Sequence, residues 1–150
     1  MYKLSSKSTG RFVDIINLIV GEIIKSHRAI KDGSKYAVSF PYIRGRIIFK
    51  QKTYSENFVI YSISLATEKD SDGKYIEDPE VRVAHLKNYG EYLPYFYTKG
   101  IGRYRVSEIA CAFNRRGYIL KEVTEKEQRE IKGFISSFLH ELYNRMEING

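Results

Sequence analysis

Six carboxylate residues are crowded into residues 68–80, the segment EKDSDGKYIEDPE, although the chain carries a formal charge of +7. They are a third of the eighteen acidic residues of the protein. A carboxylate cluster of this density can bind a divalent cation, transfer protons or form a solvated turn. The chemistry of this segment is the first question that the sequence raises.

Carboxylates on neighbouring strands can hold Mg²⁺, which activates water for phosphodiester cleavage while a nearby cation stabilises the charge on phosphate. A strand that begins near Glu80 places Glu80 and Arg82 on one face, because side chains alternate along a strand. Asp78, directly before Pro79, is biased to extended backbone and can share that face. An acid from the preceding turn can approach across the hairpin. We therefore predict that the magnesium ligands are Asp70, Asp72, Asp78 and Glu80, and that the catalytic residues are Asp78, Glu80 and Arg82.

An acidic residue followed after a short interval by Glu80-Val81-Arg82 on a strand, behind an N-terminal helix, resembles the PD-(D/E)xK nuclease pattern. The resemblance covers roughly residues 10–87 and implies a Mg²⁺-dependent nuclease that acts on DNA. Arg82 stands where the family has Lys, and the family's Pro-Asp pair occurs here in reverse order. Because Arg cannot be deprotonated, Arg82 can supply charge but cannot act as a base. Lys87 is the alternative, although its odd offset from Glu80 places it on the other face unless a bulge intervenes.

The segments LATEKDSDGKYIEDPEV and LPYFYTKGIGRYRV are also similar to uncharacterised plasmid-borne and mobile-element proteins with an acidic turn followed by Asp-Pro-Glu. This resemblance implies no activity, and it favours a viral or mobile-element origin. The abundance of Ile, Lys and Tyr, without Trp, also resembles the composition of proteins from thermophilic archaea and their viruses.

Alternatives to a metal site stay open. The sequence DSDGK is typical of a tight turn, so the acids can be solvated or paired with Lys69, Lys74 and Arg82. The acidic hairpin can also contact a basic surface of a partner subunit, in a non-catalytic, dimeric DNA-binding or virion/plasmid-maintenance protein. A protein that binds and counters a host factor is a third class. A calcium loop is excluded, because Pro79 stands where an EF-hand needs its bidentate Glu.

The 25 Lys and Arg residues outnumber the 18 acids, which favours a polyanionic partner, with DNA as the leading candidate. Four cations at even spacing occur in YIRGRIIFKQK, so a regular strand places them on one face, opposite Ile47 and Phe49. Arginines interleaved with tyrosines in GRYRV and NRRGY suit phosphate contact and base stacking, or ordinary solvated charge. The predicted nucleic-acid-binding residues are Arg44, Arg46, Lys50, Lys52, Arg103, Arg105, Arg115 and Arg116.

The elements that must position these residues form one α+β domain over residues 1–150. Apolar residues at helical spacing predict a first helix over 11–27 and a long amphipathic helix after the capping-box pair Thr124 and Glu127. Both are expected to cover a face of the sheet, with a short helix over 107–113. Between the terminal helices the period changes to two, which predicts an antiparallel or mixed meander of four to six strands over 35–40, 46–50, 58–66, 80–86, 101–106 and 117–123.

The aromatic segment 91–102 is too interrupted by proline and glycine for a long strand, and a lid, a dimer contact and core packing stay open for it. Cys111 is expected to be a small buried hydrophobic residue, and a single cysteine excludes an intrachain disulfide. The N-terminus lacks a secretory signal pattern, and no apolar run approaches the roughly 20 residues of a membrane span. These features predict a cytoplasmic location, in the host cytoplasm if viral, without membrane association.

Overall fold

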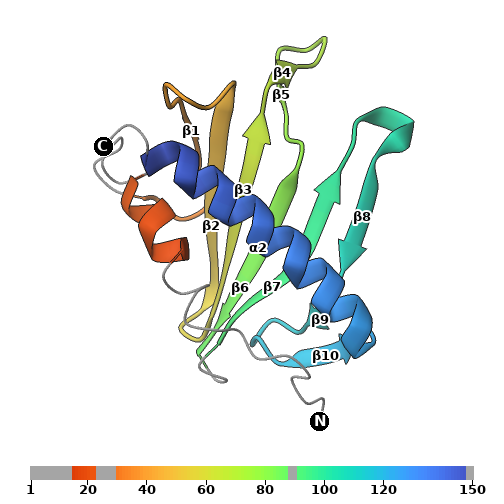
Figure 1. The fold of residues 1–150 in the computed structure, drawn as a ribbon. Helices are drawn as coiled ribbons and strands as arrows, with labels where there is room; N and C mark the ends of the chain where they lie inside the picture. Colours follow the sequence, from red (N-terminus) through yellow and green to blue (C-terminus); the bar gives the residue numbers. More distant parts are fainter. Residues whose placement is uncertain (1–14, 23–29, 88–90, 148–150) are drawn as a thin grey trace.

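The structure is a computed structural model that describes residues 15–22, 30–87 and 91–147. Its main element is a six-stranded antiparallel sheet with the strand order β1-β2-β3-β6-β7-β8 (Figure 1). The strands of this sheet are β1 (Lys35–Val38), β2 (Arg46–Ser55), β3 (Phe58–Ala66), β6 (Glu80–Leu86), β7 (Glu91–Lys99) and β8 (Val106–Ile109). The other described strands form two small hairpins: β4 (Glu68–Lys69) with β5 (Tyr75–Ile76), and β9 (Cys111–Phe113) with β10 (Ile119–Glu122).

The two α-helical segments that the structure describes lie on one face of the sheet (Figure 1). Helix α2 (Glu125–Glu147) crosses that face diagonally, and the helical residues 15–22 lie near its C-terminal end (Figure 1). The predicted α+β architecture with a long C-terminal helix is therefore confirmed. Of the helix predicted over 11–27, residues 15–22 are helical with Ile15, Ile16 and Ile19 buried, and the other positions lie outside the described residues.

Helix α2 begins at the predicted capping box. The backbone N–H of Glu127 donates to Thr124 Oγ1 at 3.2 Å, and that hydroxyl donates to Glu127 Oε1 at 3.0 Å. Farther along the helix, Ile131, Ile135 and Leu139 are at most 4% exposed, because their spacing places them on the face toward the sheet. Truncation of a buried residue of this size to Ala costs about 2–5 kcal/mol, so this stripe anchors α2.

Cross-strand register separates the two faces of the sheet, because directly paired residues lie on the same face. One row runs through Phe49, Ile63, Val81 and Tyr97. Tyr97 stacks on Phe134 of α2 with ring centroids 4.1 Å apart, so this row faces the helix. The neighbouring row therefore faces away from α2, and it contains Lys35, Lys50, Ser62, Arg82, Phe96 and Ile109.

The aromatic segment 91–102 corrects one prediction, because most of it is a long strand. Its first nine residues form β7, which lies inside the sheet between β6 and β8. The β6–β7 pairing shifts register between Arg82 and Val83, opposite Pro94, and proline is tolerated at such a bulge. Leu93 and Tyr95 of β7 are buried, which agrees with core packing among the three alternatives.

The segment 101–113 corrects two further predictions. Residues 102–104 form a 3-10 turn and not a strand. Gly100, before this turn, and Gly102, its first residue, have φ angles of 92° and 62°, which favour glycine. The expected short helix over 107–113 is replaced by strand β8 and strand β9. A helix of this length has little stability of its own, whereas pairing with β7 and β10 satisfies the backbone of the two strands.

Candidate functional site

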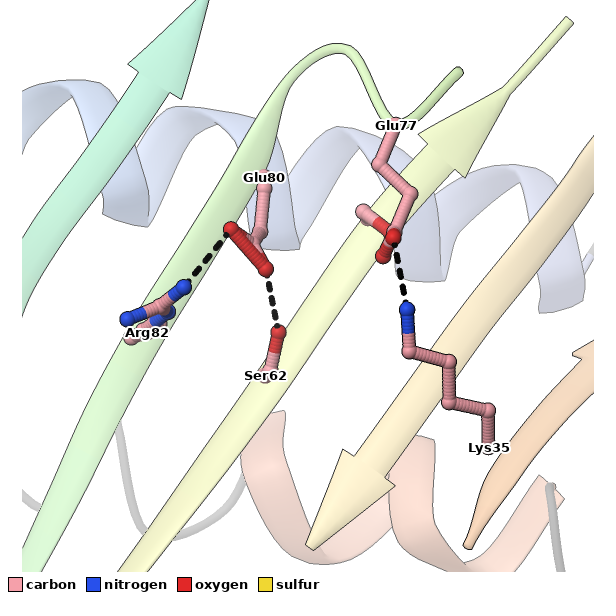
Figure 2. Close-up of polar contacts among 6 residues, drawn as sticks. Lys35, Ser62, Glu77, Glu80 and Arg82 are labelled. Atoms are coloured by element: carbon pink, nitrogen blue, oxygen red, sulfur yellow. Dashed lines mark hydrogen bonds and ion pairs between the residues drawn. The ribbon is translucent and has the colours of Figure 1, made fainter. Parts of the chain in front are cut away.

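A cavity of about 250 Å³ opens on the sheet face that is turned away from α2, and we call it the charged cavity. In Figure 2 the side chains that meet there lie in front of the sheet, while α2 lies behind it. The residues that line the cavity come from β1, β2, β3, β6, β7 and the β5–β6 connection. The lining residues are Lys35, Lys50, Lys52, Tyr54, Ile60, Ser62, Glu77, Glu80, Arg82 and Tyr95.

Glu80 is held by one neighbour on its own strand and one on β3. Its carboxylate accepts a hydrogen bond from Ser62 Oγ at 2.9 Å and pairs with Arg82 Nη2 at 3.2 Å (Figure 2). The predicted placement of Glu80 and Arg82 on one face is therefore confirmed. Arg82 also lies over the ring of Phe96, with Cζ 4.4 Å from the ring centroid. The carboxylate and the ring together fix the position of the guanidinium group.

Glu77 contacts one side chain of β3 and one side chain of β1. Its Oε1 accepts a hydrogen bond from Ser64 Oγ at 2.6 Å, and its Oε2 pairs with Lys35 Nζ at 3.1 Å. Ser64 is fully buried, whereas the side chain of Lys35 is 60% exposed. Glu77 therefore satisfies a buried hydroxyl and neutralises one lysine of the cavity.

Two lysines of β2 complete the charged cavity. Among the described residues, neither Lys50 nor Lys52 takes part in an ion pair. Lys52 Nζ lies 5.7 Å from the ring centroid of Tyr54. The cavity has four cations and two carboxylates, and both carboxylates are paired, so the excess positive charge is located on the two β2 lysines. An anion is attracted to that position.

The four predicted magnesium ligands lie at different places. The Oδ1 atom of Asp70 accepts hydrogen bonds from two backbone N–H groups of its own turn, each at 2.9 Å, and Asp72 is exposed in that turn. Asp78 Oδ1 accepts the N–H of Gly100 at 2.7 Å, and only Glu80 lines the charged cavity. Over residues 15–22, 30–87 and 91–147, no three His, Cys, Asp or Glu residues are gathered to hold a metal ion. This arrangement does not match a four-acid site, and the magnesium ion stays a prediction.

The predicted basic row on β2 is correct in part. Lys50 and Lys52 line the charged cavity, and Arg46 lies at an even offset from them on the same strand. Arg44 does not belong to the row, because β2 begins only at Arg46. Gly45 has a φ of 92°, and a Cβ at this position would lie 2.2 Å from a backbone oxygen, so the regular alternation ends there.

The other four predicted arginines lie outside the charged cavity. Arg103 and Arg105 are exposed in the connection from β7 to β8, where the guanidinium of Arg103 lies 5.0 Å from the ring centroid of Tyr104. Arg115 and Arg116 are exposed in the turn between β9 and β10. Of these four, only Arg115 lines a cavity that adjoins the charged one.

Burial keeps two weak acids beside the cavity in their neutral forms. It raises the pKa of Tyr95 to about 12, although the guanidinium of Arg82 opposes the rise. Burial also raises the pKa of Cys111 to about 12; Glu122 adds to the rise and Lys132 opposes it. Cys111 is therefore a thiol at neutral pH, as expected of a small buried hydrophobic residue.

Sequence reasoning did not single out Lys35, Ser62 or Glu77 for the site. The only local signal was the position of Glu77 inside the acidic segment. Lys35 reaches the cavity because it pairs with Lys50 across β1 and β2, and Ser62 because it pairs with Arg82 across β3 and β6. These pairings depend on strand register, which the residues themselves do not reveal.

Comparison of the chain with family models, curated proteins and solved structures gave no match. None of the described helices combines the length and the apolar composition that crossing a membrane requires. The function is therefore inferred from the geometry and the charge of the cavity.

Proposed function

We propose that the protein binds nucleic acid by holding phosphate groups in the charged cavity. The observation that supports this function is the excess of cations there, with Lys50 and Lys52 left unpaired by Glu77 and Glu80. The formal charge of +7 adds a general attraction for polyanions. Phosphate contacts of this kind supply affinity without dependence on base sequence.

Arg82 contributes directional hydrogen bonds to the same site. A guanidinium group carries five N–H donors in a planar fork that matches phosphate oxygens. The ion pair with Glu80 involves Nη2, so donors remain for an anion in the cavity. The ring of Phe96 holds the plane of the group, which reduces the entropy lost when a phosphate binds.

The test is the affinity for a fluorescently labelled DNA strand, measured by anisotropy over a series of salt concentrations. Each phosphate contact contributes about 0.7 to 0.9 to the slope of log affinity against log salt. We expect Lys50→Ala to weaken binding and to reduce the slope by about that amount. The matched control is Lys126→Ala, which removes the same charge from an exposed position on α2, on the other side of the sheet. Equal effects of the two variants, or binding of the parent protein that does not depend on salt, would contradict the proposal.

A Mg²⁺-dependent nuclease is the second candidate, because Glu77 and Glu80 line the same cavity as the predicted phosphate site. Magnesium is commonly bound by one or two carboxylates together with substrate phosphates. Cleavage is tested by incubating linear DNA with Mg²⁺ or with EDTA, with Glu80→Ala beside the parent protein. Equal cutting by both proteins would exclude a role of Glu80 in catalysis. If the parent protein binds DNA and does not cut it, only the non-catalytic function remains. Sedimentation then tests the homodimer that is predicted for this function.

A further inference from the structure

A second cavity, of about 290 Å³, lies beside the charged cavity, and we call it the aromatic cavity. Its lining includes Tyr54, Phe58, Ile60, Tyr95, Phe113 and Arg115. Phe113 contacts two of the other rings, with centroids 5.3 Å from Phe58 and 5.0 Å from Tyr95. The hairpin β9–β10 thus supplies one wall of this cavity, and the sheet supplies the other.

The two cavities adjoin each other, because Tyr54, Ile60 and Tyr95 line both, and we call the pair the groove. Tyr54 is the exposed member at this boundary, with half of its surface in solvent. Its ring stacks on Phe58 at a centroid distance of 5.1 Å and an interplanar angle of 23°. Lys52 lies over the same ring. The ammonium group of Lys52 therefore lies next to an aromatic ring that Phe58 holds in place.

We propose that the aromatic cavity takes an unstacked base of a single-stranded nucleic acid while the adjoining phosphate lies in the charged cavity. This inference rests on the proposed function and specifies its ligand. A nucleotide joins an anion to a flat apolar ring. In the same way, a cavity with excess positive charge adjoins a cavity lined by aromatic rings. In a duplex the bases are stacked and paired, so their faces are not available to a protein.

The division of the groove into two adjoining cavities also favours a strand over a single small molecule. Adjoining cavities suit successive parts of a longer chain. Arg115 places another cation beside the base site, where it can contact a second phosphate of the strand.

The decisive probe is an abasic DNA strand, which keeps the phosphates and lacks the bases. We compare it by anisotropy with oligothymidylate and oligouridylate of the same length and with a duplex. Stacking of one base on an aromatic side chain contributes roughly five- to a hundredfold in affinity. We therefore expect oligothymidylate to bind about tenfold more tightly than the abasic strand or the duplex, and the uridylate arm shows whether RNA binds equally well.

Tyr54→Leu should lower the affinity for oligothymidylate by more than it lowers the affinity for the abasic strand, and so remove most of that preference. Tyr42→Leu is the matched control, because Tyr42 is 60% exposed and lines neither cavity. Since the protein has no tryptophan, Tyr54→Trp also provides a single tryptophan at the boundary, whose emission can be excited selectively. Its emission should be quenched by oligothymidylate and not by the abasic strand.

The outcomes separate the two proposals. Equal affinity for the abasic strand and oligothymidylate, with no effect of Tyr54→Leu, would overturn the base site and leave phosphate binding intact. Tighter binding of the duplex than of either single strand would overturn it as well. Failure of every nucleic acid to bind would overturn the proposed function itself.

Discussion

The acidic segment 68–80 divides into two regions in which the same kind of side chain has different partners. In the turn between β4 and β5, Asp70 accepts hydrogen bonds from backbone N–H groups two and four positions along the chain. Glu77 and Glu80 contact side chains on other strands, Lys35 at a separation of 42 positions and Ser62 at 18. The acids of the turn are exposed, whereas Glu77 and Glu80 are half-buried.

This difference shows that the separation between partners determines what a carboxylate does here. The contacts of Asp70 lie within five residues and stabilise only its own turn, whereas the contacts of Glu77 and Glu80 with other strands hold the sheet face together. Substitutions at the cavity should therefore change stability or binding, and substitutions in the turn should change both very little.

The largest effect on the free energy of unfolding is expected at high pH, from Tyr95 in the wall of the charged cavity. Folding raises the pKa of Tyr95 to about 12 from its ordinary value near 10, so the folded protein favours the neutral phenol. The resulting stability is fully present below pH 10 and is lost as the pH rises toward 12, by about 3 kcal/mol at most. Tyr95→Phe should remove this loss, as measured by urea unfolding between pH 8 and about 11.5.

Cys111 also lowers the stability at high pH, and it does so equally in the parent protein and in Tyr95→Phe. Its pKa is raised from an ordinary value near 9 to about 12, so it contributes a somewhat larger loss that begins about one pH unit earlier. The difference between parent and Tyr95→Phe should therefore open only above pH 10. Identical pH profiles of the two proteins would show that the Tyr95 hydroxyl is not buried as described.

The next largest effect is expected for Glu77→Leu. This change leaves the hydroxyl of the fully buried Ser64 without its acceptor, which costs about 1–3 kcal/mol of unfolding free energy. Glu77→Gln keeps an oxygen for Ser64 and loses only the exposed ion pair with Lys35, so it should cost less than about 1 kcal/mol. The double variant Ser64→Ala/Glu77→Leu should recover part of the loss. Strict additivity of the two substitutions would contradict the proposed coupling.

A smaller effect is expected in the turn, for Asp70→Ala. Two backbone N–H groups lose their acceptor, but both are at the surface and can bind water instead, so the cost should be about 1 kcal/mol or less. Chemical denaturation measures the cost, and hydrogen exchange at residues 72 and 74 should show where it occurs. A loss as large as that of Glu77→Leu would remove the distinction between the two regions.

The smallest effect is expected for Asp72→Ala. This exposed carboxylate forms no ion pair within the described part of the chain, so the free energy of unfolding should change by less than about 0.5 kcal/mol. DNA affinity should stay within a factor of about two, because the residue lines neither cavity. A large loss of affinity would instead favour the predicted metal site in this turn.

Much of the fold followed from local patterns in the sequence. The strands Phe58–Ala66 and Glu80–Leu86 have the bounds that alternation predicted, and the capping pair marks the start of α2. The prediction for residues 91–102 was wrong because a bulge in the β6–β7 pairing accommodates Pro94, and a bulge is a property of two strands. The short helix over 107–113 was wrong for a similar reason, since pairing partners decided its conformation.

The sequence by itself determined the long C-terminal helix, the strands Phe58–Ala66 and Glu80–Leu86, the face shared by Glu80 and Arg82, and the tight turn at Asp70. These features depend on contacts between residues a few positions apart, where backbone geometry leaves few alternatives. Only the tertiary structure decided that Lys35 and Glu77 join Glu80 and Arg82 at one cavity, while Asp70 and Asp78 lie elsewhere. Such an assembly depends on strand register, which packing across the whole sheet sets.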